Sequence, residues 1–319
     1  MRGCHNFCPR PDQEKEMTRK AVILMAYGTP RTLDDVEAYY THIRGGRKPS
    51  EAELSDLVQR YKAIGGTSPL TEITRKQSSG LNERLLRVGS NTRVYAAMKH
   101  SPPFIASVVK QASDDGVDEL LAIALAPHYS RTSIGSYIAS VREANEGLRR
   151  RMKLTFVESW HDHPALVDVW SRRVNDAASR IGERFWLVFS AHSLPARILA
   201  EGDPYNTQLL ATSELVAKRA GRKDWSFSYQ SASQTHEPWL GPDILEHLES
   251  LRARGERSLL IAPIGFVSDH LEILYDIDVE CARWAKGAGV GLRRCESLND
   301  SSEFLDCLFS IVRDRGFLI

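Results

Sequence analysis

The sequence has few cysteines, and they form no pattern that could anchor a fold. The 319-residue chain has five cysteines, an odd number, and no CxxC pair. A disulfide framework and a structural zinc site are therefore not indicated, and the reducing cytoplasm fits this usage. Cys281, Cys295 and Cys307 are too widely spaced for the ligand runs of an iron–sulfur cluster, so we expect neither such a cluster nor another prosthetic group.

Long hydrophobic runs are absent as well. The longest uncharged apolar stretch covers eleven residues, 258–268, whereas about 20 are needed to span a bilayer. Residues 1–20 are polar and lack the apolar segment of a secretory signal, so we interpret them as an N-terminal tail in which Met17 offers an alternative start. The sequence thus predicts a cytoplasmic protein that does not insert into membranes.

The chain also lacks an excess of one charge and the common nucleotide-binding motifs. Its formal net charge is +1, and the charges are interspersed, so no basic surface typical of nucleic-acid binding stands out. No GxGxxG or P-loop follows a strand-like run, and GxSxG is absent. These absences argue against a nucleic-acid partner and a nucleotide cofactor.

Short apolar runs that alternate with helical patterns are the main feature present. The first half contains AVILMAY, TRVYAAM, ELLAIALAP and KLTFVES, and the second contains RFWLVFSAH, WSFSYQS, SLLIAPIGF and GLRRCES. Such alternation predicts an α/β fold with parallel sheets. The chain is also longer than a single hydrophobic core usually supports. We therefore predict two similar Rossmann-like lobes, over residues 21–160 and 161–319, with a C-terminal helix that packs back on the first lobe.

Repeated dipeptides indicate that the two halves arose by internal duplication. AY at 26–27 corresponds to AH at 191–192, and AP at 126–127 corresponds to AP at 262–263. The first half is longer between these matched points. We therefore expect an insertion in the first lobe.

The insertion is predicted at about residues 40–70, as a helical flap. Ser50 and Glu53 form a capping box at the start of a helix, and Gly65 with Gly66 ends it. In open α/β sheets, ligands bind beyond the carboxyl ends of the strands. The flap and the loops that follow these ends should therefore border one cleft.

Two segments in these loops carry candidate metal ligands. His192 directly follows an apolar strand, although a histidine there is equally often a structural residue, and His128 shares this ambiguity. In GFVSDHLEILYDIDVE, Glu272, Asp276 and Glu280 recur every four residues, which places them near one face of an α-helix. Leu271, Leu274 and Tyr275 would form its apolar stripe.

The same carboxylates have two interpretations. They could be an ordinary solvated acidic face, or a route for a cation. Imidazole together with carboxylate suits divalent iron, zinc or manganese and binds weakly enough to release the metal. Because the helix follows a strand that looks buried, we favour the cation route.

Basic and aromatic residues of the flap region suit a flat, acidic ligand. Guanidinium groups match carboxylates, and aromatic rings offer flat apolar walls. A solvated flap with half-buried tyrosines is the alternative. The residues concerned are Arg44, Arg47, Lys48, Arg60, Tyr27, Tyr40, Tyr61 and Tyr137.

Seven motifs together resemble ferrochelatases. They are MAYGTP, YYTHIRGGRKP, RYKAIGGTSPL, SAHSLP, EGDPY, WLGPD and GFVSDHLEILYD. The resemblance covers about residues 21–317 and is closest to the coproporphyrin-type enzymes of Gram-positive bacteria. It implies two Rossmann-like lobes that clamp a porphyrin between them, and a lyase of haem biosynthesis that inserts ferrous iron into coproporphyrin III to give Fe-coproporphyrin III (coproheme).

The resemblance also implies roles for individual residues. His192 and Glu272 match the catalytic pair that holds iron on one face of the macrocycle, with Asp276 and Glu280 as a metal path. A tyrosine facing the opposite side matches Tyr27. Gly45 departs from the pattern, because relatives carry a second arginine there. The remaining porphyrin contacts match Arg44, Arg60, Tyr61, Ser68 and Tyr137.

The implied mechanism bends the porphyrin so that its pyrrole protons can be removed. His192 is then expected to accept a proton as a neutral imidazole with a pKa near ~6.5. The expected partners are coproporphyrin III and ferrous iron as substrates, and a downstream haem-pathway enzyme that receives coproheme. The absence of the long C-terminal extension of mitochondrial relatives favours a monomer.

Three alternatives stay open. The first is a ferrochelatase that prefers protoporphyrin IX. The second is a cobalt or nickel chelatase of a sirohydrochlorin-like ring, although such enzymes usually present two histidines to the metal. The third is a non-catalytic tetrapyrrole carrier, which would bind the ring tightly without turnover.

Overall fold

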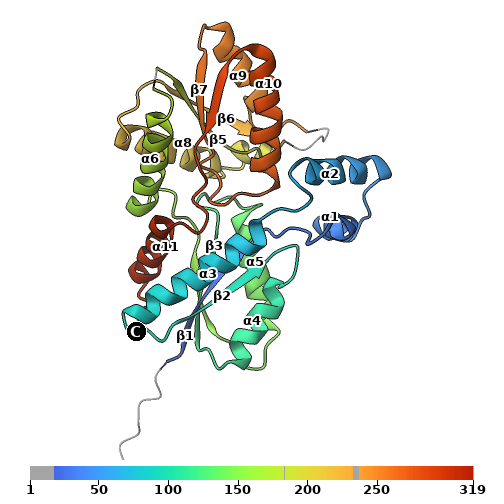
Figure 1. The fold of residues 1–319 in the computed structure, drawn as a ribbon. Helices are drawn as coiled ribbons and strands as arrows, with labels where there is room; N and C mark the ends of the chain where they lie inside the picture. Colours follow the sequence, from blue (N-terminus) through green and yellow to red (C-terminus); the bar gives the residue numbers. More distant parts are fainter. Residues whose placement is uncertain (1–17, 183, 233–236, 319) are drawn as a thin grey trace, which may run out of the picture.

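The computed structural model describes residues 18–318, except residue 183 and residues 233–236. Most of the predicted N-terminal tail, including Met17, lies outside the described residues. The chain forms two parallel four-stranded sheets, in the orders β2-β1-β3-β4 and β6-β5-β7-β8, each flanked by helices (Figure 1). The predicted α/β fold class with two similar lobes is thereby confirmed.

The elements follow one another in the order that the alternating patterns predict. They are β1 (Lys20–Ala26), η1 (Leu33–Asp35), α1 (Val36–Ile43), α2 (Glu51–Ala63), α3 (Leu70–Arg87), β2 (Arg93–Met98), α4 (Ile105–Asp114), β3 (Glu119–Ala124), α5 (Ile134–Glu146), β4 (Lys153–Val157), α6 (Pro164–Ser179), β5 (Trp186–His192), α7 (Arg197–Ala200), α8 (Tyr205–Arg219), β6 (Trp225–Gln230), α9 (Ile244–Ala253), β7 (Ser258–Ala262), η2 (Ile273–Cys281), α10 (Ala282–Ala288), β8 (Gly291–Arg294) and α11 (Ser302–Asp314).

The central strands are buried on both faces. In β1, every residue from Ala21 to Ala26 is buried, and all five residues of β7 are buried. Continuous apolar strands of this kind occur in parallel sheets that are covered by helices on both sides. The carboxyl ends of β1, β3, β5 and β7 are therefore fixed in position by the core, and the loops after them can carry functional side chains.

The flap helices α1 and α2 project from the side of the first lobe (Figure 1). The predicted capping box is present: the Glu53 backbone N–H donates to Ser50 Oγ at 3.3 Å, and the Ser50 N–H donates to Glu53 Oε2 at 2.7 Å. The helix ends just before Gly65 and Gly66, whose φ angles of 96° and 99° lie in the left-handed region that favours glycine.

The largest hydrophobic cluster belongs to both lobes. It contains Leu24 and Ile123 from the first sheet and Phe189 and Leu260 from the second. The C-terminal helix α11 lies between the lobes and packs against both α3 and α6 (Figure 1). Its Phe304 is fully buried and joins the same cluster. One continuous core therefore holds the two sheets together.

Candidate active site

His192 is the last residue of β5, a strand whose five central residues are buried. Its Nε2 lies 3.4 Å from Oε1 of Glu272, and its Nδ1 contacts the Ser193 carbonyl oxygen. About a third of each side chain of this pair is exposed. The two predicted metal ligands are thus brought together at a partly open position.

The backbone around Glu272 is held by polar contacts from the neighbouring strands. The Gln230 amide at the end of β6 donates to the Glu272 carbonyl at 3.3 Å and accepts from Ser190 Oγ of β5 at 2.9 Å. Gly265 approaches the backbone of β5 so closely that a Cβ there would lie 2.8 Å from Cα of Ala191. The strand that carries His192 and the turn that precedes Glu272 are therefore fixed relative to each other.

A second histidine contacts the same carboxylate. His270 Nε2 lies 3.5 Å from Oε2 of Glu272, so the carboxylate lies between two imidazoles. The sequence interpretation gave His270 no special context. Its position two residues before Glu272 in the same motif was the available signal.

The ion pair determines the charges of the two side chains. Burial alone would lower the pKa of His192, but the Glu272 carboxylate at 3.4 Å raises that pKa to about 9. Burial would raise the pKa of Glu272, yet the two neighbouring imidazoles hold it well below its usual range. The ring is therefore an imidazolium at neutral pH, whereas the sequence interpretation expected a neutral imidazole with a pKa near ~6.5. The difference arises from the carboxylate partner.

The acidic segment is a π-helix, η2, whereas the sequence interpretation assumed an α-helix. The predicted apolar stripe of Leu271, Leu274 and Tyr275 is wrong, because these residues are only partly buried. Ile273, Ile277 and Cys281, at four-residue steps, face the core instead. A π-helix has more than four residues per turn, so this spacing stays on one side of it, and such helices are frequent at functional sites.

Asp276 lies beside this buried stripe and is only 6% exposed. Its side chain accepts a short hydrogen bond from Ser231 Oγ, and an Arg60 nitrogen lies 3.8 Å away. Burial, together with the Glu272 carboxylate, raises the pKa of Asp276 to about 7. This carboxyl group can therefore exchange a proton near neutral pH.

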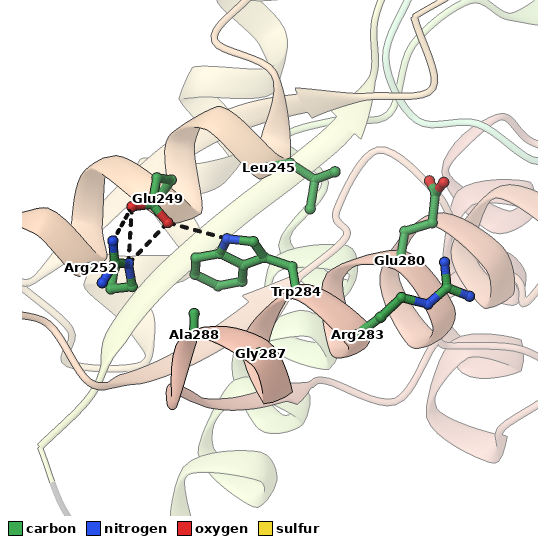
Figure 2. A pocket seen from close by; sticks show the side chains of 8 residues that line it. All are labelled: Leu245, Glu249, Arg252, Glu280, Arg283, Trp284, Gly287 and Ala288. Carbon is green, nitrogen blue, oxygen red and sulfur yellow. Dashed lines mark hydrogen bonds and ion pairs between the residues drawn. The ribbon is translucent and has the colours of Figure 1, made fainter.

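Glu280 reaches the outer surface of the second lobe. It borders a pocket between α9 and α10 in which Trp284 donates a hydrogen bond to Glu249 at 3.3 Å (Figure 2). This pocket contains neither His192 nor Glu272. The row from Glu272 through Asp276 to Glu280 therefore leads from the metal pair to the surface.

The first lobe supplies the facing wall of the cleft. Tyr27, directly after β1, is 43% exposed, whereas Tyr61 and Tyr137 are buried. Burial and, to a smaller extent, the Glu272 carboxylate both raise the pKa of Tyr27, so the two side chains lie within range of an electrostatic interaction. Burial raises the pKa of Tyr61 to about 12, and its hydroxyl lies 3.2 Å from that of Thr29.

The predicted porphyrin contacts of the flap already have partners within the protein. Arg44 pairs with Glu53 at 2.6 Å, and Arg60 pairs with Asp56 at 2.9 Å. Ser68 Oγ accepts the backbone N–H of residue 70 at 3.3 Å. Arg60 also adjoins the acidic row, as described above. A carboxylate ligand would therefore have to compete with Glu53 for Arg44 and with Asp56 for Arg60.

No helix among the residues that the structure describes is long and apolar enough to cross a membrane.

The two parallel sheets form a two-lobed α/β fold of the kind seen in solved chelatases. The fold is similar to that of sirohydrochlorin chelatase SirB from Bacillus subtilis subspecies spizizenii in complex with cobalt, with a TM-score of 0.56, 10% identity, and coverage of 93% of this chain and 95% of that one. A structure of SirB from Bacillus subtilis with Fe3+ gives a TM-score of 0.59, with the same identity and coverage. These likenesses concern the fold alone.

The sequence identifies the family within this class. The family model described as Ferrochelatase matches residues 19–316, so the chain belongs to the ferrochelatase family, as the motifs predicted. A ferrochelatase of Herpetosiphon aurantiacus is 43% identical, over 92% of this chain and 98% of its own length. Coproporphyrin III ferrochelatases of Halalkalibacterium halodurans and Geobacillus kaustophilus are 42% and 44% identical, over 94% and 92% of this chain and 98% and 95% of theirs.

Proposed function

We propose that this protein inserts ferrous iron into coproporphyrin III to give Fe-coproporphyrin III in haem biosynthesis. The proposal rests on the pairing of His192 with Glu272 at 3.4 Å, with Tyr27 of the first lobe close enough for the Glu272 carboxylate to raise its pKa. A metal ion at the pair would meet one face of a flat ring whose other face lies toward Tyr27. The similarity to proteins named coproporphyrin III ferrochelatase supports this choice of substrate.

The reaction exchanges the two pyrrole protons of the free-base ring for one Fe2+, so the site must accept protons as well as hold a cation. The resting imidazolium of His192 cannot accept a proton while Glu272 stabilises its charge. A divalent ion on Glu272 would offset the carboxylate charge and lower the pKa of His192. The neutral imidazole would then serve as the base for a pyrrole proton.

The acidic row suits the transfer of ions between the pair and the solvent. Asp276, with its pKa near 7, can take up and release a proton at physiological pH, and Glu280 lies at the surface end. We assign Arg44, Arg60, Tyr61, Ser68 and Tyr137 to porphyrin contacts. We further propose a cytoplasmic monomer that passes coproheme to a downstream haem-pathway enzyme.

The test is an anaerobic assay with ferrous iron and, separately, coproporphyrin III and protoporphyrin IX, which follows the loss of free-base porphyrin fluorescence. We expect faster turnover of coproporphyrin III. Faster turnover of protoporphyrin IX would keep the family activity and overturn the proposed substrate. Binding of both rings without metallation would favour a carrier.

A pair of histidine variants tests the assignment of the metal site. His192→Ala should abolish insertion while porphyrin binding persists. The matched control is His247→Ala, because His247 bonds to Ser226 Oγ at 2.7 Å within the second lobe. Normal turnover in His192→Ala, or equal losses in both variants, would contradict the assignment.

A further inference from the structure

Hydrogen bonds join the loop after β3 in the first lobe to the N-terminal half of α8 in the second, and we call this set of contacts between the lobes the polar seam. His128 is buried, and its Nε2 lies 2.9 Å from Thr212 Oγ1. The Tyr129 backbone N–H donates to Gln208 Oε1 at 2.7 Å. The seam is thus built from hydrogen bonds between a fixed loop and one helix.

Asp203 is the charged residue of this seam, and it is only 8% exposed. Its Oδ2 accepts hydrogen bonds from Ser130 Oγ at 3.0 Å and from the Arg131 backbone N–H at 2.8 Å, both in the first lobe. Its Oδ1 accepts the Tyr205 backbone N–H at 3.0 Å, in the second lobe. A buried carboxylate with three donors is held strongly in one position, because hydrogen bonds to charged groups are the stronger ones.

Tyr205 continues the connection to the metal pair. It is the first residue of α8 and only 7% exposed. Its hydroxyl donates to the backbone carbonyl of His192 at 2.9 Å. The carbonyl lies at the end of β5, where a partner from outside the sheet can set the direction of the last residue. Ser130, Asp203, Tyr205 and His192 therefore form one continuous chain of contacts from the first lobe to the metal pair.

We infer that Asp203 and Tyr205 are positioning residues, which hold His192 at a fixed place relative to the porphyrin-facing wall of the first lobe. The inference rests on the proposed role of His192. It also gives a role to the EGDPY motif, residues 201–205, for which the sequence alone suggested none. Helix α5, which carries Tyr137, begins three residues after Arg131, so the same seam links that wall to His192.

The test is Tyr205→Phe, which removes the hydroxyl and keeps the ring that packs in the core. Because the reacting geometry depends on small displacements, we expect kcat to fall about 5- to 10-fold, equivalent to about 1 to 1.4 kcal/mol. We also expect the KM for ferrous iron to rise at least about threefold and the Kd for coproporphyrin III to change less than about twofold. A loss of folded protein alone would lower kcat and leave the KM for iron unchanged.

The matched control is Tyr229→Phe. Tyr229 is a buried tyrosine of the same lobe, and its hydroxyl donates to Asn206 rather than to His192. This variant should keep both kinetic constants within about twofold of the wild type. Equal effects in the two tyrosine variants would overturn the inference.

A second variant keeps the inference testable if Tyr205→Phe does not fold. Ser130→Ala removes one hydrogen bond to Asp203 from the side of the first lobe. It should raise the KM for iron and lower kcat by about two- to threefold, and unchanged constants would overturn the inference. Wild-type turnover, with its loss in His192→Ala, tests the proposed function separately. If the wild type does not metallate the ring, both the function and the positioning roles fall.

Discussion

Replacing Glu272 by Gln should change the charge of His192 in the metal-free protein. The substitution keeps the shape of the side chain but removes the carboxylate that lies 3.4 Å from the ring. That carboxylate raises the pKa of His192 to about 9, against the opposing effect of burial. Without it, the pKa should fall to about 6.5 or below. At pH 7.5 the ring would change from mostly protonated to mostly neutral.

The same change has a consequence for stability. A rise in pKa from 6.5 to about 9 corresponds to at most about 3.4 kcal/mol. Because 32% of the side chain is exposed, solvent screening reduces this to about 1 to 2 kcal/mol. Since the folded pKa is the higher one, this stabilisation is complete below pH 6.5 and is lost as the pH rises through 9. Glu272→Gln should lack this loss.

The assay is an NMR titration of histidine rings labelled with 13C at Cε1, from pH 5.5 to 10 in metal-free buffer. The chain has ten histidines, and comparison with His192→Ala assigns the relevant signal. Urea unfolding at pH 6.5 and 9 gives the stability difference. Glu280→Gln is the control, because it removes a carboxylate at the surface end of the row. A pKa that stays near 9 in Glu272→Gln, or that falls equally in the control, would refute the reasoning.

Three further predictions follow from the core and the acidic row. Gly265→Ala should lower kcat at least tenfold more than Gly80→Ala. The new Cβ at residue 265 would meet the backbone of Ala191, next to His192, whereas at residue 80 it would meet only the side chain of Leu305, which can move. Equal losses of kcat in steady-state assays would contradict this. Phe304→Ala should lower the free energy of unfolding in urea by about 3 to 5 kcal/mol, since the ring is fully buried between the lobes, and a loss below 1 kcal/mol would argue against its core position. Asp276→Asn should become more stable relative to wild type as the pH rises from 4 to 8, by up to about 4 kcal/mol. The reason is that the Asp276 carboxyl, whose folded-state pKa is raised to about 7, destabilises the wild-type fold as the pH rises through that value. A difference in Tm between the two proteins that does not depend on pH would exclude this.

The sequence could predict the parts of the fold that depend on local patterns. Apolar runs with parallel-sheet character gave the strands, and the capping box of Ser50 and Glu53 placed the start of α2 within the flap. The order of strands within each sheet and the core shared by the lobes depend on contacts between distant residues, and no local pattern encodes them.

The pairing of the two candidate ligands was predictable from the sequence, whereas their charges were not. His192 and Glu272 could be found because each follows a buried strand. The π-helix could not be predicted, because Leu274 and Tyr275 fit an α-helical period equally well, whereas in the structure Ile273, Ile277 and Cys281 are the buried apolar residues of this segment. The contact between His270 and Glu272 depends on the path of the loop. The pairing of the flap arginines with neighbouring carboxylates is a result of folding that composition does not reveal.

The core shared by the lobes has a consequence for how the molecule can change shape. Domains that close around ligands usually move about a hinge between separate cores. Here helix α11 packs on elements of both lobes, and the strands of both sheets contribute to one cluster. Hinge opening would expose that apolar surface to water at a large free-energy cost. The flap formed by α1 and α2 contributes none of the residues in that cluster, so a shift of the flap would leave the shared core intact. A change of shape at the flap would therefore cost less buried apolar surface than one at the junction of the two lobes.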